Sequence, residues 1–457
     1  MSVFRKPLTC HRTTRATLLM PELPKLNLLL FLLLTLFLSP HPVSGQEQPD
    51  YFYPDYFRCD DHVYVPHIRT VMLHRAGWEL SAPQIALATE EKLLLSFDDL
   101  QGGRQDYRYT LIHCDAAWRP SELLPSDYLQ GFTEGYITDY QASYNTLQRY
   151  THYSLLFPED EVKPLLSGNY LLKIYAAERP DEPLITRRFL IVEELVSIRG
   201  RVHAATEIED RDYRQEIDFS IDLLGYAMDQ PYRNLKVVVQ QNGRWDNAIT
   251  GMQPRMMNGG MLDYDLESGN VFDGLNEFRH VDLKSLRYLT DRVMQILEDD
   301  TSYTLRVQPD LRRPFQVYSL DRDINGRFLV KVNEGTDSRV EAEYVRVEFT
   351  LPYESPLLNG NVYLIGAFTA WGKDPEARMR WDPRHKAYLA TLYLKQGYYN
   401  YLYGYLEDGQ SFSDAALIEG THQETENDYT ILAYYRETGG RYDRLIGITQ
   451  LNSLTDR

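Results

Sequence analysis

Asn361-Val-Tyr-Leu-Ile-Gly366 leads into Ala367-Phe-Thr-Ala-Trp371, and two further runs follow after a turn, Lys386-Ala-Tyr-Leu-Ala-Thr-Leu-Tyr-Leu394 and Tyr398-Tyr-Asn-Tyr-Leu-Tyr403. The side chains of the later runs alternate in character, and successive side chains of an extended chain point to opposite faces. Such alternation is typical of half-buried strands. The stretch therefore predicts a β-sandwich of antiparallel sheets, each with one solvated face.

Strand-like runs recur along the chain and predict three β-rich units after residue 45. Their predicted ranges are 46–194, 195–335 and 336–457, in keeping with the roughly two to four domains that a chain of this length allows. The first unit has seven short runs separated by turns, which suggests an immunoglobulin-like sandwich. These runs are 70–73, 85–87, 92–97, 107–112, 152–157, 170–175 and 188–192.

The other two units are also rich in strand-like runs. Those of the middle unit predict a second sandwich and lie at 199–203, 216–221, 235–240, 303–307 and 327–332. Runs at 344–350, 429–435 and 445–448 add to the third unit. Apolar residues at helix-like intervals predict a helix over 282–297, although strands remain an alternative because the intervals drift.

The N-terminus has the pattern of a signal peptide. Basic residues precede an apolar run over 26–38, and the small residues Ser44 and Gly45 follow, so we predict a signal peptide over 1–45. A membrane anchor is disfavoured because the run is shorter than the ~20 residues that a spanning helix needs. No Cys lies directly after the cleavage site for lipid attachment. We therefore expect an exported, periplasmic protein without a membrane span of its own.

The chain is strongly acidic. The first 45 residues carry five basic side chains and one acidic one, so the formal charge falls from −18 for the whole chain to −22 after cleavage. Nucleic acid is therefore not an expected partner, because binding it requires a basic face that displaces counterions.

Two cysteines remain after cleavage, Cys59 and Cys114. Disulfides persist outside the inner membrane, so these residues could form a bridge. Two separate buried thiols are the alternative. The fold does not depend on a bridge, because a chain of this length can bury several cores.

The segment Asp321-Arg-Asp323-Ile-Asn325-Gly326 begins like a calcium-binding loop. The twelfth position of such a loop requires a carboxylate that closes the coordination sphere, and here that position is Val332. A hairpin turn at Asn325-Gly326 accounts for the same residues and is the favoured interpretation. We predict no metal site, while a weaker calcium site stays open.

No arrangement of residues in the sequence predicts catalysis. His113-Cys114-Asp115 are neighbours on one predicted strand, so their side chains diverge and cannot converge on one ion or bond. Acidic pairs such as Asp98-Asp99 are adjacent and diverge in the same way, unlike the facing carboxylates of glycosidases. We therefore expect no enzyme activity, no cofactor and no small-molecule substrate.

The segment around Gly366–Trp371, with Leu394-Lys-Gln-Gly397 and Asp408-Gly409, resembles early-set, glycogen-binding modules. Such modules hold sugar with two tryptophans and a lysine, and only Trp371 matches here, since Leu402 and Ser411 occupy the other positions. Trp371 is then a vestigial sugar-platform position. The resemblance implies an all-β fold of tandem immunoglobulin-like or early-set β-sandwich domains, and it leaves a periplasmic carbohydrate-binding protein of a glycan-uptake system as the alternative function.

The connection between two strands of the first unit, 116–150, is long and aromatic. Tyr128, Phe132 and Tyr136 are among its aromatic residues. Long connections are often functional, and Tyr is favoured at protein contacts because it buries a large area and keeps a polar tip. We therefore expect this connection to pack on the sandwich or on a partner.

Scattered motifs across the mature chain resemble the plug protein family of the type IX secretion system. They include Ile112-His-Cys-Asp115 with Trp118, Ser143-Tyr-Asn-Thr146, Tyr150-Thr-His-Tyr153, Asp323-Ile-Asn-Gly-Arg-Phe328, Leu394-Lys-Gln-Gly-Tyr-Tyr-Asn-Tyr401 and Asp443-Arg-Leu-Ile-Gly447. The resemblance implies a non-enzymatic periplasmic plug that seals the periplasmic opening of the large outer-membrane translocon β-barrel while no cargo passes. Under that hypothesis, Tyr128, Phe132 and Tyr136 form part of the barrel contact.

Overall fold

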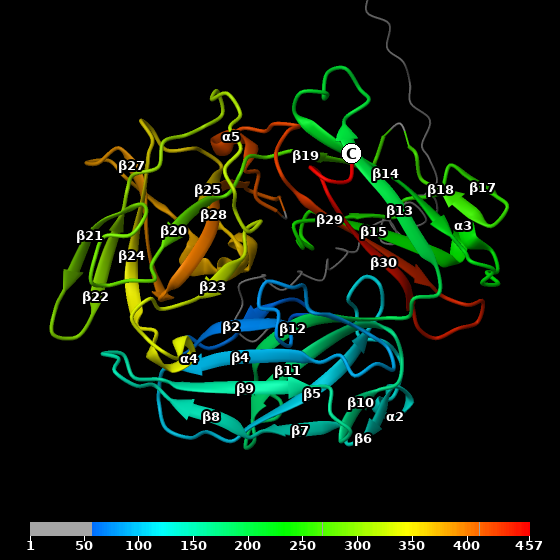
Figure 1. The fold of residues 1–457 in the computed structure, drawn as a ribbon, viewed down its shortest axis with the longest axis horizontal. Coiled ribbons are helices and arrows are strands. Elements are labelled where there is room, and N and C mark those ends of the chain that lie inside the picture. Colours follow the sequence, from blue (N-terminus) through cyan, green and yellow to red (C-terminus); the bar gives the residue numbers. More distant parts are fainter. Residues whose placement is uncertain (1–56, 267, 411) are drawn as a thin grey trace, which may run out of the picture. The chain divides into compact units, whose positions relative to one another are not determined.

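The computed structural model describes residues 57–266, 268–410 and 412–457. The predicted signal peptide and Ser411 lie outside these residues. The fold is all-β, as predicted: within the described ranges, six of the seven sheets pack in pairs around three cores, and each α-helix has four residues (Figure 1). Every strand-like run predicted from the sequence coincides with all or part of a strand.

The first sandwich contains the strands predicted for the first unit. One sheet has the order β1 (His62–Val63), β12 (Pro183–Val192), β11 (Gly168–Ala176), β5 (Tyr107–Cys114), β7 (Glu134–Ile137), with β3 (Gln84–Ala86) parallel to β12. The other has the order β2 (Ile68–Arg75), β4 (Leu93–Asp99), β9 (Thr151–Phe157), β8 (Asp139–Ala142). Leu93, Leu95 and Phe97 show why β4 forms here, because every second side chain enters the core.

A small two-stranded sheet is added to the first sandwich by the long connection. It consists of β6 (Leu129–Gly131), which follows α2 (Pro125–Tyr128), and β10 (Val162–Pro164). Leu129 of β6 and Val162 of β10 both belong to the core of the first sandwich. The connection is therefore an ordered part of this sandwich.

The second sandwich combines the middle of the chain with its end. One sheet has the order β13 (Ser197–Ala204), β14 (Arg214–Asp222), β18 (Met261–Asp263), β17 (Met256–Asn258), and β19 (Val271–Asp273) also pairs with β14. The other has the order β16 (Ile249–Thr250), β15 (Leu235–Gln241), β29 (Asp428–Tyr435), β30 (Arg444–Asn452). The helix α3 (Pro231–Asn234) leads directly into β15.

The third sandwich is formed by the residues between these two parts. One sheet has the order β20 (Arg279–Asp282), β28 (Gly397–Glu407), β23 (Phe328–Val330), with β25 (Gly360–Ile365) also on β28. The other has the order β21 (Val293–Glu298), β22 (Tyr303–Val307), β24 (Tyr344–Pro352), β27 (Ala387–Lys395), β26 (Arg380–Asp382). Four short helical segments complete it: α4 (Ser338–Glu341), η1 (Ala367–Gly372), η2 (Pro375–Ala377) and α5 (Ala416–Glu419).

This pairing does not follow the boundary that we predicted between 335 and 336. Strands β20 to β23 lie before that boundary and pair within the third sandwich, whereas β29 and β30 lie after it and pair with β15 of the second. The reason is that apolar alternation marks a strand but does not select its neighbour, which is a long-range choice.

The helix predicted over 282–297 is wrong. Leu283 is buried in the core of the third sandwich, Leu289 is exposed, and β21 begins at Val293. Residues 283–292 connect β20 to β21, and only β21 pairs with β22, with a register shift between Val293 and Gln295. The apolar spacing drifts because the segment combines an irregular connection with the start of a strand.

Apolar and charged contacts join the three sandwiches. A fourth core cluster lies between the first two sandwiches and contains Leu171 and Leu190 of the first together with Leu432 and Tyr434 of the second. Lys395 at the end of β27 donates to the Asp98 carboxylate of β4 at 2.6 Å, and both side chains are buried. The first sandwich is thereby held to both of the others.

Candidate functional site

The long aromatic connection supplies the outermost strand of each sheet of the first sandwich. Strand β7 ends one sheet beside β5, and β8 ends the other beside β9 (Figure 1). Edge strands present unpaired backbone groups, and they are ready places for contact with another chain. The predicted contact segment thus forms an edge of the sandwich.

The structure separates the three aromatic residues that we predicted as contacts. Phe132 and Tyr136 are 65% and 62% exposed, whereas Tyr128 is only 5% exposed. The Tyr128 hydroxyl donates to the Leu111 carbonyl at 3.2 Å inside the sandwich. Tyr128 is therefore a core residue and is removed from the candidate contact, because the short helix α2 turns its ring inward.

The ring of Tyr136 is held in place by its neighbours. The Arg108 guanidinium lies over it, 4.6 Å from the ring centroid, and Arg108 also forms an ion pair with Glu134. The hydroxyl of Tyr175 donates to Glu134 at 2.5 Å, and this bond lowers the pKa of the Glu134 carboxyl. Tyr136 is thus an exposed aromatic group on a supported strand.

Two further tyrosines that sequence reasoning did not assign extend this edge. Tyr140 of β8 and Tyr144 just after it are both exposed. We call Phe132, Tyr136, Tyr140 and Tyr144 the aromatic edge. Large exposed aromatic groups in one segment are typical of interaction surfaces. The sequence showed that these aromatic residues lie close together in the chain, but it did not show which of their side chains are exposed.

A cavity of about 600 Å³ is lined by residues of all three sandwiches. Three tryptophans line it, Trp118, Trp245 and Trp371. The Arg188 guanidinium lies over the first two rings, 4.5 and 5.6 Å from their centroids. Cation–π contacts of this kind hold the two tryptophan rings in place within the protein.

Trp371, the vestigial sugar-platform position, packs against the protein. Its ring lies edge-on to Phe278, with centroids 6.2 Å apart, and the Arg244 guanidinium lies 5.4 Å from its centroid. Leu402, at the position of the platform lysine, is fully buried in the same cluster. A sugar platform needs an open aromatic face, so these contacts favour a packing role for Trp371.

Cys59 and Cys114 are free thiols in the structure, so it does not contain the disulfide that the sequence allowed. Both residues belong to the cluster between the first two sandwiches. Burial raises the pKa of both thiols. Two separate thiols, one buried at Cys114 and one half-buried at Cys59, are close to the alternative that the sequence left open.

His113, Cys114 and Asp115 point to separate partners. His113 Nδ1 lies 3.0 Å from the Ser121 hydroxyl, and the Asp115 carboxylate accepts from Arg119 at 2.7 Å. Asp115 also accepts the backbone N–H of Ala117 at 2.9 Å. These contacts shape the loop after β5.

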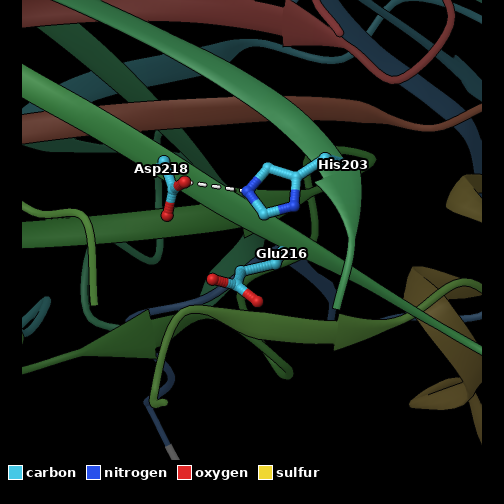
Figure 2. Close-up of side chains that lie close together, drawn as sticks. All are labelled: His203, Glu216 and Asp218. Carbon is cyan, nitrogen blue, oxygen red and sulfur yellow. Dashed lines mark hydrogen bonds and ion pairs between the residues drawn. The ribbon is translucent and has the colours of Figure 1, made fainter. Parts of the chain in front are cut away.

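Figure 2 shows a group of His203 on β13 with Glu216 and Asp218 on β14. His203 Nε2 lies 2.8 Å from an Asp218 carboxylate oxygen, and the Arg201 guanidinium donates to the same oxygen at 2.8 Å. Asp218 thus already has a cationic partner. These three side chains are of types that can bind a metal ion, but the Arg201 guanidinium already supplies the positive charge beside Asp218 that an ion would bring.

Asn325 and Gly326 adopt left-handed backbone angles, with φ of +51° and +75°. The Arg327 N–H donates to the Ile324 carbonyl at 3.1 Å, which closes a tight turn over these residues. The turn precedes β23, but no described strand precedes it as a partner. The predicted turn is therefore present, although it does not join two paired strands.

None of the helices within the described ranges has the length and apolar content needed to cross a membrane.

Comparisons with known proteins agree with this architecture. A model of the first domain of the type 9 secretion system plug protein matches residues 68–193, which run from β2 to just after β12. No curated protein matches the chain. A crystal structure of a hypothetical protein from Parabacteroides merdae ATCC 43184 is similar, with a TM-score of 0.84 and 34% identity over 87% of this chain and 100% of the other. The match of the plug-domain model leads to one conclusion: the first sandwich of this chain belongs to the type IX secretion system plug protein family, as its first domain.

Proposed function

We propose that this protein seals the periplasmic opening of the outer-membrane type IX translocon barrel while no cargo passes, and that it does so without catalysing a reaction. The match of the plug-domain model to residues 68–193 carries this proposal. The family implies an association with the secretion machinery, and the barrel is the partner that we infer.

The aromatic edge supports the proposal because closing a pore requires contact area and hydrogen-bonding groups. Phe132 and Tyr136 offer large apolar surfaces, and the tyrosine also offers a hydroxyl at its tip. The edge belongs to the first sandwich, the same part of the chain that the plug-domain model matches. We therefore assign the barrel contact to this edge.

A rigid body also suits a plug, since a flexible chain would pay a larger ordering cost on binding. The Asp98–Lys395 pair and the cluster around Leu432 and Tyr434 connect the first sandwich to the others. We infer that the three sandwiches act as one body. The predicted signal peptide would deliver this body to the periplasm, where the barrel would hold it at the outer membrane.

The experiment that tests the proposal is affinity purification of the tagged protein from native envelopes, followed by identification of the membrane proteins that co-purify. We expect the translocon barrel with the wild-type protein. The double variant Phe132→Ala and Tyr136→Ala should lose most of the barrel while keeping the wild-type melting temperature.

The matched control replaces two exposed tyrosines of the second sandwich, Tyr213→Ala and Tyr232→Ala. It should retain the barrel. If the control variant alone lost the barrel, the barrel contact would have to lie on the second sandwich rather than on the aromatic edge. Absence of the barrel from every preparation would refute the plug proposal itself.

The carbohydrate-binding alternative has one observation in its favour, the cavity that Trp118, Trp245 and Trp371 line. Recovery of glycan-uptake components in the same purification would support it. A glycan-array signal that disappears in Trp371→Ala would then assign the sugar to this cavity.

A further inference from the structure

Three carboxylates from distant parts of the sequence meet at one place in the fold. Glu277 lies just before β20, Asp323 lies before β23, and Glu426 lies before β29. One oxygen of each lies within 4.8 Å of an oxygen of both others. The first two residues belong to the third sandwich and Glu426 leads into the second, so the cluster lies where the chain passes from one to the other.

The three carboxylates have no ion-pair partner in the part of the chain that the structure describes. Among residues 57–266, 268–410 and 412–457, none of them pairs with Lys, Arg or His. By contrast, the nearby buried carboxylate of Glu419 pairs with both Arg279 and Arg313. Three close negative groups without a counter-charge repel one another, and the repulsion is stronger away from water.

Hydrogen bonds orient the carboxylates but use only part of their oxygens. Glu277 Oε1 accepts from the Tyr318 hydroxyl at 2.5 Å and from the Glu426 N–H at 3.1 Å. Asp323 accepts the N–H groups of Phe278 and Asn325. The cluster is thus held in place before any further ligand is considered.

Two buried oxygens accept no hydrogen bond from the described residues. They are Oε2 of Glu277, a residue only 1% exposed, and Oδ1 of the buried Asn325. The Asn325 amide lies beside the cluster, because its Nδ2 is 3.4 Å from Glu426 Oε1. Buried polar atoms almost always have partners, so the unpartnered Glu277 Oε2 of this cluster points to a ligand.

We propose that Glu277, Asp323 and Glu426 bind one calcium ion. All three donors are hard oxygen ligands, which Ca²⁺ prefers, and the set has no nitrogen or sulfur that would favour zinc. Two oxygens that each lie about 2.4 Å from one ion are at most about 4.8 Å apart. The separations in the cluster meet this limit.

The raised pKa values in the cluster are consistent with a site that lacks a positive charge to balance its carboxylates. Burial, with the neighbouring Glu277 and Glu426 carboxylates, raises the pKa of Asp323 to about 7, and burial also raises the pKa of Glu277. A shared proton would relieve the same repulsion. The binding experiment below distinguishes the proton from the ion.

The ion would also hold the base of an exposed loop. Residues 308–327 lead from β22 to β23, and within them Phe315 and Val317 are 97% and 92% exposed. Tyr318 of this loop is bonded to Glu277, and Asp323 is close to its end. Calcium would therefore fix the loop and link the second and third sandwiches at one point.

The test is calorimetric titration of CaCl₂ into the chelator-treated full chain at neutral pH. We expect one site with a dissociation constant at or below about 1 mM, the upper range for calcium-binding modules outside the cell. Glu277→Gln and Asp323→Asn keep side-chain size, and each should weaken binding at least about tenfold. A rise in melting temperature with calcium should accompany binding and should disappear in both variants.

The matched control is Glu216→Gln, which makes the same change in the other carboxylate group, where Arg201 supplies the positive charge. Its calcium affinity should equal that of the wild-type protein. Terbium luminescence excited through tyrosine gives a second readout, since Tyr318 contacts Glu277, and it should be lost in Glu277→Gln. The proposal would be overturned if the wild-type protein bound no calcium at concentrations up to 10-fold above about 1 mM, or if the Asp323→Asn variant bound calcium as tightly as the wild type. A shared proton would then be the remaining way to relieve the repulsion between the carboxylates.

Discussion

At the scale of single residues, the buried pair of Asp98 and Lys395 decides how the first and third sandwiches meet. The Asp98 carboxylate accepts from Lys395, from the Tyr344 hydroxyl at 2.7 Å and from His152 Nδ1 at 2.7 Å. The ammonium also lies 4.2 Å from the centroid of the Tyr150 ring. A buried charge is tolerated only when partners replace its water, and here each charge has several.

Lys395→Met should destabilise the protein by about 3–5 kcal/mol, because it leaves the Asp98 charge buried without its cation. Urea unfolding would measure the loss of free energy. The double variant Asp98→Asn with Lys395→Met should lose less than the single one, since neither charge then remains. A single variant within 1 kcal/mol of the wild-type protein would show that the pair does not hold this joint.

The same pair predicts how stability depends on pH. Burial alone would raise the pKa of Asp98, but the Lys395 ammonium and His152 outweigh it and hold that pKa below its ordinary value. Its contribution is therefore present above the unfolded pKa of about 3.9 and is lost as pH falls through the lower folded value.

We expect Asp98→Asn to be less stable than the wild-type protein at pH 7 and this difference to shrink as the pH approaches about 3. Urea midpoints measured between these pH values would show it. A difference that stays constant with pH would mean that Asp98 does not titrate with folding.

At the scale of elements, the short strands of the long connection determine whether the aromatic edge is presented. Gly131 ends β6 with φ of +89°, and a Cβ atom there would lie 2.3 Å from the Glu161 carbonyl oxygen. The neighbouring Phe132 N–H donates to that same carbonyl at 2.6 Å. The glycine is thus required both by its backbone angle and by this close approach.

Gly131→Ala should therefore destabilise the protein by about 2–4 kcal/mol and reduce recovery of the barrel. Gly102→Ala is the control, because Gly102 has φ of +69° but no atom within 4 Å of the added methyl group. The control should lose only the strain of a left-handed backbone, about 1–2 kcal/mol. Equal losses in the two variants would mean that the contact with Glu161 adds nothing.

At the scale of the whole molecule, the clusters between sandwiches make the joints part of the folded core. Cys59 and Cys114 report on one joint, because both belong to the cluster between the first two sandwiches. Their raised pKa values further slow reaction with thiol reagents.

We expect both thiols to resist labelling in the native protein and to react after unfolding without a reductant. Mass spectrometry of labelled residues 46–457 would count them. Fast native labelling of Cys114 would show that the joint opens, and absence of label after unfolding would reveal a disulfide.

Local pattern predicted much of this fold. The positions of most longer strands followed from alternation, which is a property of neighbouring residues, whereas β7, β8 and β21 were not predicted. The family resemblance rested on short motifs, and the plug-domain model matches the first domain. Asp323 lies in the segment that begins like a calcium-binding loop, which the sequence analysis interpreted as a turn. Glu277 and Glu426 gave no such signal, because both are far from Asp323 in the sequence and meet it only after folding.

The amino-acid sequence by itself determined the all-β class and the places where most of the longer strands form, since both depend on side chains two residues apart. Only the tertiary structure decided that β29 and β30 return to β15, that Tyr128 is buried while Phe132 and Tyr136 stay exposed, and that three distant carboxylates meet. The physical reason is that burial and pairing depend on which surfaces touch after folding, and a strand with two suitable faces does not specify its partner in its own residues.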